Sequence, residues 1–261
     1  MAGAPLDVTA SFRPGAREGP TAIRLASACL ETYSSKFDRD LEEVQFFDAG
    51  DLELVGADPE QSLRQVEELI HEVVAAGKKP LLLGGEHLVT LPAVEAMFSA
   101  YPNLAVVQMD AHADLRPEYL GQALSHATVM YGVATKVGAK NLFQLGIRSG
   151  VREEWQWGGQ HTNFYPYQLL APLAQIKPQL VDRPIYLTVD IDVVDPAYAP
   201  GTGSPEPEGV TAEELLQAIR ILAGLKVVGA DIVEVAPAWD PSQRTALLAA
   251  KIARELLLGV L

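Results

Sequence analysis

Five short apolar runs, separated by helical patterns, most constrain the fold of this sequence. They read KPLLLGG (79–85), NLAVVQMD (103–110), NLFQLGIRS (141–149), RPIYLTVDID (183–192) and KVVGADIVEV (226–235). Their apolar residues are continuous rather than alternating, which is typical of parallel strands covered on both faces. The pattern predicts an α/β fold: a single domain over residues 1–261, with a mostly parallel central sheet and helices on both faces. With 261 residues, 48% of them hydrophobic, the chain can bury one large core.

Helix signals fill the segments between these runs. Residues 60–79 predict a helix that Gly77 ends, and residues 211–224 predict another that opens with a capping box of Thr211 and Glu214. In 240–259, Asp240 is the expected N-cap, with Pro241 in the first turn and Gly259 past the end. The Pro/Gly-rich segment 195–209 is expected to be a functional loop rather than a domain boundary.

The formal net charge of −14 argues against nucleic acid or an anionic membrane as the main partner. It suits a small cationic molecule, although acidity also serves solubility alone. No apolar run approaches the ~20 residues that span a bilayer, and no secretory signal is visible. Cys29 is the only cysteine and is expected to be a small buried residue in a helix. These features predict a soluble cytoplasmic protein.

Polar side chains follow three of the predicted strands at the point where each strand ends. His87 follows the first run, Asp110, His112 and Asp114 follow the second, and Asp190 and Asp192 end the fourth. Ligands of open α/β sheets bind beyond the carboxyl ends of the strands. Alternate residues of an extended segment point the same way, so these six side chains are expected to converge.

Four carboxylates gathered in one place would repel one another unless protons or cations neutralise them. Four anions and two neutral imidazoles suit two divalent ions, and a donor set rich in oxygen favours Mn²⁺ over Zn²⁺. Any single aspartate here could equally be an ordinary polar residue or a helix cap. The joint spacing D-x-H-x-D plus D-x-D is what favours a binuclear metal site.

The segments GGEH, MDAHADL, TVDIDVVDPAYAPGTGSPEPEG and ADIVEVAPAWDPSQRTAL resemble the signature segments of the ureohydrolases, the arginase and agmatinase family. SFRPGAREGPTAIRLAS, near the start, is similar to the agmatinase branch. The resemblance covers nearly the whole chain. Relatives carry more residues ahead of MAGAPLD, so a missing or shortened first strand is expected.

The resemblance implies two Mn²⁺ ions per subunit. One ion would be held by His87, Asp110, Asp114 and Asp190, and the other by Asp110, His112, Asp190 and Asp192. It also implies that His126 shuttles protons at the pocket mouth and that Glu234 holds the substrate guanidinium. From the residues alone, His126 could be a surface loop histidine and Glu234 a structural carboxylate.

The implied reaction is attack on the guanidinium carbon by a hydroxide that bridges the two ions, with Asp114 passing a proton to the leaving amine. The loops GIRSGVREEW and LRPEYLGQALSH lack the groups that would clamp an α-amino acid, and Ser149 stands where an acid would be expected. Agmatine, cleaved to putrescine and urea, is therefore the expected substrate. Aminopropylagmatine, guanidinobutyrate or arginine, and a catalytically inert metal-binding homologue, remain alternatives. The resemblance also implies a homo-oligomer, a trimer or a hexamer.

Four further polar residues receive no catalytic role. His71 is expected to be solvated on its helix and His161 to lie in a loop. Asp195 is expected to serve a turn. Arg116 is a candidate for the pocket entrance and no more.

Overall fold

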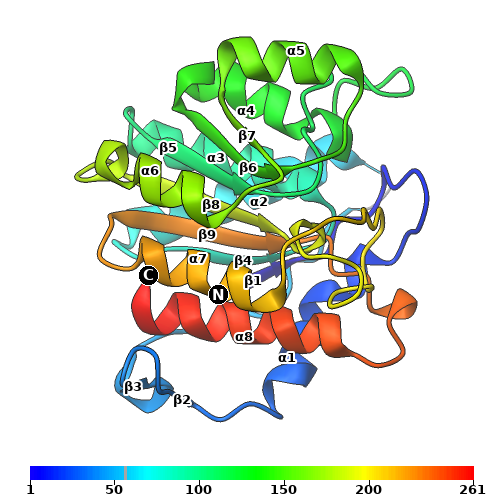
Figure 1. Cartoon of the computed structure of the whole chain (residues 1–261). Helices are drawn as coiled ribbons and strands as arrows, with labels where there is room; N and C mark the ends of the chain where they lie inside the picture. The colour runs from blue at the N-terminus through cyan, green and yellow to red at the C-terminus, as the bar shows by residue number, and fades with distance from the viewer. Residues whose placement is uncertain (56–57) are drawn as a thin grey trace.

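The computed structural model describes residues 1–55 and 58–261, and a seven-stranded sheet forms the middle of that part of the chain (Figure 1). Every neighbouring pair of strands in it is parallel. The α/β class is therefore confirmed. From edge to edge the strands are β1 (Ala2–Ala4), β4 (Leu81–Gly84), β9 (Val227–Val233), β8 (Ile185–Asp190), β5 (Ala105–Met109), β6 (Leu142–Ile147) and β7 (Asn163–Pro166).

The five predicted runs form the five inner strands, β4, β9, β8, β5 and β6. The two edge strands, β1 and β7, had no signal because they are short and carry no apolar run. The first strand is thus present, although it spans three residues. A small antiparallel ribbon of β2 (Tyr33–Ser34) and β3 (Arg39–Asp40) lies apart from the sheet.

Helices cover both faces of the sheet, as expected (Figure 1). Alternation along the strands divides the core, because Leu81 and Leu83 of β4 face one helical layer while Leu82 faces the other. The first layer contains α1 (Gly19–Ser27), α6 (Leu170–Leu180), α7 (Ala212–Leu222) and α8 (Arg244–Gly259); the second contains α2 (Pro59–Ala75), α3 (Thr90–Ala100) and α4 (Val129–Val137). The remaining helix, α5 (Arg152–His161), packs beside β7.

Helix α7 begins as predicted, with the reciprocal side-chain bonds of Thr211 and Glu214. The predicted start of α8 is wrong, because the helix begins at Arg244 and its N-cap is Gln243. Asp240 still accepts the backbone N–H of Thr245 at 2.8 Å, so it serves the first turn from outside the helix. Gly259 is the last helical residue rather than the one beyond it.

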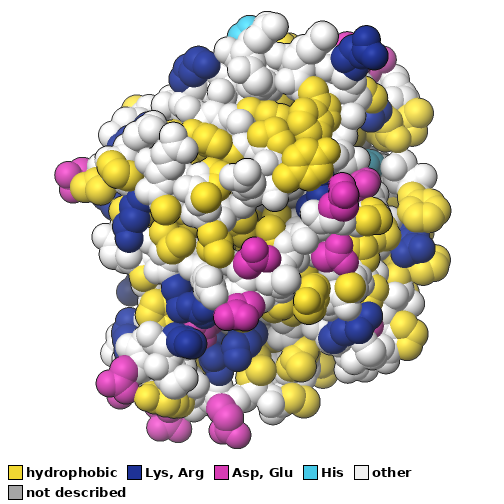
Figure 2. All heavy atoms as spheres, viewed as in Figure 1, with side chains coloured by type: hydrophobic (Ala, Val, Ile, Leu, Met, Phe, Trp, Pro, Cys, Tyr) yellow, Lys and Arg dark blue, Asp and Glu magenta, His cyan; other side chains and the backbone are white. Residues whose placement is uncertain are grey.

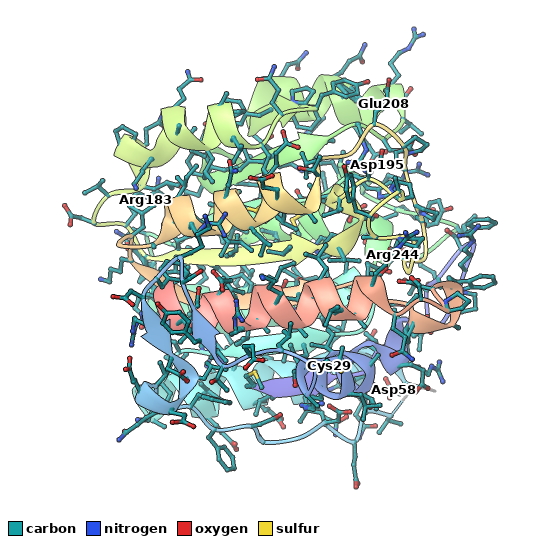
Figure 3. All side chains as sticks on the ribbon, turned by 60° about the horizontal axis from the view of Figure 1, so that its bottom comes forward. Cys29, Asp58, Arg183, Asp195, Glu208 and Arg244 are labelled. Carbon is teal, nitrogen blue, oxygen red and sulfur yellow. The ribbon has the colours of Figure 1, made fainter. Side chains whose placement is uncertain are left out.

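The prediction for Cys29 is also wrong. Helix α1 ends at Ser27, and Cys29 lies exposed in the turn that follows it (Figure 3). The buried stripe of this helix consists of Ile23 and Ala26, and Leu30 packs against the core where the stripe would continue. Because the helix ends at Ser27, helical periodicity does not determine the position of Cys29.

His161 is the last residue of α5 and not a loop residue. The glycines of this segment suggested a loop, yet Gly158 is required for packing, because a Cβ there would come within 2.8 Å of the Phe164 ring. His71 lies exposed on α2, 3.7 Å from Glu67, as expected.

The helices in the described ranges include none long and apolar enough to cross a bilayer. On the face drawn in Figure 2, acidic and basic side chains are mixed, with apolar groups between them.

Candidate metal centre

The candidate site lies where the carboxyl ends of four neighbouring strands, β4, β9, β8 and β5, meet at one edge of the sheet. His87 opens a short 3-10 turn after β4, Asp110 directly follows β5, and Asp190 is the last residue of β8. Glu234 directly follows β9. The parallel order of these strands therefore brings together residues that are up to 147 positions apart in the sequence.

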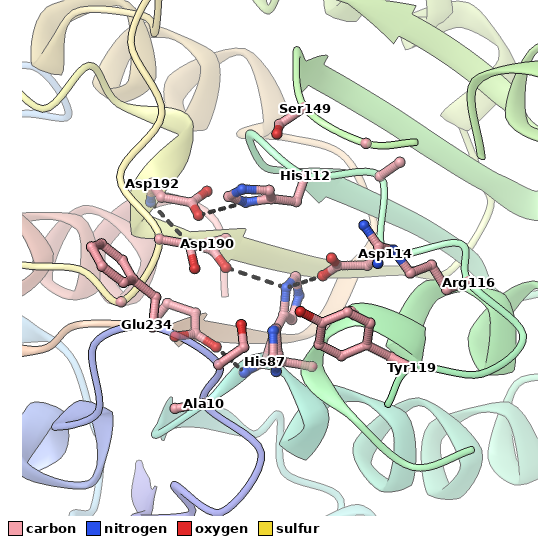
Figure 4. A pocket seen from close by; sticks show the side chains of 18 of the residues that line it. Ala10, His87, His112, Asp114, Arg116, Tyr119, Ser149, Asp190, Asp192 and Glu234 are labelled. Atoms are coloured by element: carbon pink, nitrogen blue, oxygen red, sulfur yellow. Dashed lines mark hydrogen bonds and ion pairs between the residues drawn. The ribbon is translucent and has the colours of Figure 1, made fainter. Parts of the chain in front are cut away.

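One ring nitrogen of His87 faces three carboxylates, and Figure 4 shows two of them, those of Asp114 and Asp190. The Nδ1 atom of His87 lies 3.1 Å from Asp110 Oδ2, 3.3 Å from Asp114 Oδ2 and 3.3 Å from Asp190 Oδ2. All four side chains are buried. The sequence predicted that these four side chains converge, and they do so in the structure.

His112 forms a second group with Asp192 and Asp110. Its Nδ1 lies 2.9 Å from Asp192 Oδ2 and 3.8 Å from Asp110 Oδ1. Within each of two sets, His87–Asp110–Asp190 and Asp110–His112–Asp192, one ligand atom from each residue lies within 4.8 Å of the others. Asp110 belongs to both sets, so the two groups share one carboxylate.

The segment that follows β5 is not the simple extended strand that was expected. Asp114 has a left-handed backbone with φ of 52°, so the extended conformation does not continue through this residue. The backbone N–H of His112 donates to Asp110 Oδ1 at 2.6 Å. A residue other than glycine in this region stores strain, and such strain is common at functional sites.

Burial and mutual repulsion make this site electrostatically costly without cations. Burial, and then the charge of Asp110, raise the pKa of Asp114 to about 7. The pKa of Asp190 is also well above its ordinary value, because of burial and the neighbouring Asp192 and Asp110. Burial lowers the pKa of His87, but its three carboxylate neighbours outweigh burial and raise it well above the ordinary value. The bare site would thus collect protons, whereas divalent cations would neutralise it.

A chain of hydroxyl groups behind His87 identifies its ligand atom. Thr90 Oγ1 donates to Asp231 Oδ2 at 2.8 Å, so Thr90 can only accept from Thr188, 3.4 Å away. Thr188 is then an acceptor for the Nε2–H of His87 at 2.9 Å. This leaves the lone pair on Nδ1, a buried atom without a hydrogen-bond partner among the described residues. An orphaned imidazole nitrogen that faces three carboxylates fits a divalent cation.

Glu234 lies beside this cluster with a left-handed backbone of φ 63°. Its Oε1 accepts the backbone N–H of His87 at 2.7 Å, and its own N–H donates to Gly85 at 2.8 Å. Burial, and then the charge of Glu86, raise the pKa of Glu234 to about 8. A nearby cation would restore the charge of this carboxylate.

A cavity of about 340 Å³ opens onto these residues, and His126 is part of its wall. Burial, followed by the charges of His112 and His87, lowers the pKa of His126 to about 4, so this imidazole is neutral at pH 7. The wall also includes Ser149 and Arg116 (Figure 4). This position is consistent with the prediction that Arg116 lies at the pocket entrance. Asp195, in contrast, accepts the backbone N–H groups of Ala197 and Gly209 and serves a turn, as expected.

Sequence reasoning missed several residues that shape the site. Segment 7–13, with Asp7, Phe12 and Arg13, forms one side of the cavity. Glu154 accepts the N–H of Leu115 at 3.0 Å. Arg148 binds the loop that follows β8 through the carbonyl oxygens of Asp192, Val193, Glu206 and Pro207. For the contacts of Arg148, the only signal in the sequence was an arginine between two glycine-containing turns.

Comparison with known proteins agrees with this geometry. The chain is 49% identical over 260 residues to the agmatinase of Bacillus anthracis, a match that covers 98% of this chain and 90% of that protein. It is 36% identical to the human mitochondrial guanidino acid hydrolase, over 98% of this chain and 76% of that protein. The crystal structure of the agmatine ureohydrolase of Thermoplasma volcanium matches with a TM-score of 0.90 and 33% identity, over 98% of this chain and 87% of that one.

A family model described as the arginase family matches residues 1–259. Given this match, the parallel sheet and the histidine–aspartate cluster at its edge, the chain belongs to the arginase family.

Proposed function

We propose that this chain is an agmatinase, which hydrolyses the guanidinium group of agmatine to urea and putrescine with two Mn²⁺ ions. The observation that carries the proposal is the pair of ligand groups that share the buried Asp110 and whose other members line one cavity with Glu234. Similarity to the agmatinase of Bacillus anthracis over nearly the whole chain supports the substrate. The donor set, rich in carboxylate oxygen, favours Mn²⁺.

The six side chains divide between the two ions. His87, Asp110, Asp114 and Asp190 would hold one ion, and Asp110, His112, Asp190 and Asp192 the other. The short distances from His87 Nδ1 to its three carboxylates support the first set, and the 2.9 Å contact between His112 and Asp192 supports the second.

When bound, such an ion pair would make water more acidic and would stabilise developing negative charge. Glu234 accepts the N–H groups of the planar guanidinium and orients its carbon toward the cluster. Asp114, whose Oδ2 lies 3.3 Å from His87 Nδ1 at the cluster, takes a proton from the attacking water and passes it to the departing amine. His126 exchanges protons with solvent at the pocket mouth.

A second candidate substrate is a guanidino acid such as guanidinobutyrate. Arg13 lies at the cavity wall, stacked 4.9 Å from the Phe12 ring and 5.1 Å from the Trp239 ring, and it forms no ion pair with the described acids. Arg116 lies on the same wall. Because Arg116 is paired with Glu154 at 3.2 Å, the guanidinium of Arg13 is the group that would attract a carboxylate tail and repel an ammonium tail.

A urea-release assay on the Mn²⁺-loaded protein tests the proposal. Agmatine should give the highest kcat/KM, ahead of aminopropylagmatine, guanidinobutyrate and arginine. Higher kcat/KM with guanidinobutyrate would reassign the substrate to the guanidino acids, and Arg13→Gln should then lower it. A protein that binds two ions and releases urea from none of these compounds would be an inert homologue.

Three further predictions belong with this proposal. Residues 1–261 act as a single ureohydrolase domain, the protein assembles into a trimer or hexamer, and it works in the cytoplasm.

A further inference from the structure

A hydrogen-bonded chain of three residues leads from Glu86 to the proposed proton shuttle, His126. Glu86 is buried, and its Oε1 accepts the hydroxyl proton of Thr9 at 2.9 Å. Thr9 Oγ1 lies 3.0 Å from Nδ1 of His126 and also accepts the backbone N–H of His126 at 3.0 Å. The three residues come from distant parts of the sequence.

The number of available protons determines which atom donates in each hydrogen bond from Glu86 to His126. An ionised carboxylate has only lone pairs, so the single hydroxyl proton of Thr9 must point to Glu86. Thr9 Oγ1 can then only accept from His126, and the proton of the imidazole must be on Nδ1. The hydroxyl of Ser125 lies 3.4 Å from Nδ1, farther than the Thr9 hydroxyl, and its oxygen can accept from the same N–H.

Glu86 is anchored so that it cannot easily turn away. Its other oxygen, Oε2, accepts the backbone N–H of Val8 at 2.7 Å and of Thr9 at 2.8 Å. Together with the Thr9 hydroxyl, these two N–H groups surround the carboxylate with donors, which fits its ionised form. They also tie segment 8–9, beside the cavity, to the turn that carries His87.

We propose that Glu86 and Thr9 are positioning residues that hold the proton of His126 on Nδ1 and leave Nε2 as the base on the cavity side. Nε2 of His126 forms no hydrogen bond within residues 1–55 and 58–261, which leaves it free for substrate or solvent. A proton taken up at Nε2 gives an imidazolium, and the carboxylate of Glu86 stabilises that charge through Thr9. The catalytic part of this inference rests on the proposed function; the tautomer does not.

The tautomer can be read directly from ¹⁵N NMR spectra of the histidine side chains in the metal-free protein at pH 8. The His126→Asn variant serves only to assign the signals. In the wild type, Nδ1 of His126 should have the shift of a protonated nitrogen and Nε2 that of an unprotonated one. Thr9→Ser keeps the hydroxyl and should give the same spectrum.

Glu86→Gln should reverse the tautomer. A glutamine that keeps its oxygen on the two backbone N–H groups must aim its NH₂ at Thr9, so the hydroxyl proton turns to Nδ1 and the imidazole proton moves to Nε2. Thr9→Val keeps the shape and the backbone anchor but should give a mixture of tautomers. Thr135→Val, the same substitution on α4, is the matched control and should change neither signal.

The loaded enzyme provides a second readout. For Glu86→Gln and Thr9→Val, kcat for urea release should fall at least about 10-fold, since general acid–base groups contribute that much or more, while KM stays within about 2-fold. Thr9→Ser should restore kcat. A wild-type spectrum with the proton on Nε2, or a Glu86→Gln spectrum identical to the wild type, would overturn the inference. Urea release by the wild type would still support the proposed function in that case.

Discussion

The Nδ1 atom of His87 lies 3.1 Å from Oδ2 of Asp110, and in the neutral tautomer that the hydroxyl chain behind the ring favours, no proton lies between these two atoms. Two electron-rich atoms at that distance require a cation or an added proton. Asp110 is also in contact with the His112 group, so one side chain determines both halves of the site.

Asp110→Asn tests this shared role, because it keeps the size of the side chain and removes its charge. Bound Mn²⁺, measured by equilibrium dialysis and elemental analysis, should fall from two ions per chain to at most one. Urea release should fall by more than the roughly 10- to 100-fold that loss of an outer contact costs. Asp195→Asn, at a turn outside the cluster, should still bind two ions. Unchanged stoichiometry in Asp110→Asn would contradict the shared site.

The stability of the metal-free protein should fall as the pH rises from 6 to 8.5. Folding raises the pKa of Asp114 from 3.8 to about 7 and that of Glu234 from 4.5 to about 8, so ionising them destabilises the folded state. The raised pKa values of His87 and His112 add stability that is complete below 6.5 and is lost as the pH rises.

Thermal melts across this pH range, with chelator or with saturating Mn²⁺, measure the effect. The two melting curves should move apart with pH, because ion binding displaces the same protons and is favoured at high pH. Parallel pH profiles with and without the ion would show that these groups are not coupled to metal binding.

Asp231→Asn should weaken metal binding although Asp231 touches no proposed ligand. The side-chain amide that this substitution introduces can donate to Thr90, whereas the carboxylate only accepts from it. Thr90 and Thr188 can then donate toward His87, so that Nε2 no longer has to carry the proton. We expect roughly 10- to 100-fold weaker Mn²⁺ binding, measured by competition with a chelating dye.

Tyr186→Phe is the matched control for Asp231. It removes the 2.8 Å bond from the Tyr186 hydroxyl to the same oxygen of Asp231, but it leaves the chain to His87 intact. It should cost about 1 kcal/mol of stability and leave metal affinity unchanged. If Asp231→Asn and Tyr186→Phe lost Mn²⁺ affinity equally, the role of Asp231 would be limited to packing.

Glu234→Gln should separate substrate binding from metal binding. The amide oxygen can still accept the N–H of His87, so two ions should remain bound. The clamp on the guanidinium loses its charge, which should lower kcat/KM for agmatine roughly 10- to 100-fold. Steady-state kinetics and dialysis on the same preparation check both parts; loss of either ion would make Glu234 a structural support instead.

Asp240→Ala should destabilise the protein by about 3 kcal/mol in chemical unfolding, because it leaves the N–H and hydroxyl of the buried Thr245 without their acceptor. Burial opposes ionisation of Asp240, but bonds from Ser242 and Thr245 outweigh it and lower its pKa. Its contribution is therefore complete above pH 3.8 and is lost as the pH falls below that value. Asp58→Ala, at the exposed N-cap of α2, should cost only about 1 kcal/mol.

The inner strands and the six-residue cluster could be predicted because their signals are local. Continuous apolar runs indicate buried strands, and each run ends directly in a polar group. Cys29, His161 and the start of α8 could not be predicted, since each depends on a distant contact or on where a helix stops. The chain from Glu86 through Thr9 to His126 joins residues 117 positions apart at its longest step, and no local pattern indicates it.

The order of the strands makes the candidate metal centre depend on β9, a strand that carries none of its six predicted ligands. β9 follows both β4 and β8 in the sequence, yet it occupies the place between them. Until it inserts, the strand before His87 has no partner on that side and remains separated from Asp190. The candidate metal centre is therefore complete only when β9 lies between these two strands, so closing the sheet and assembling the site are one event.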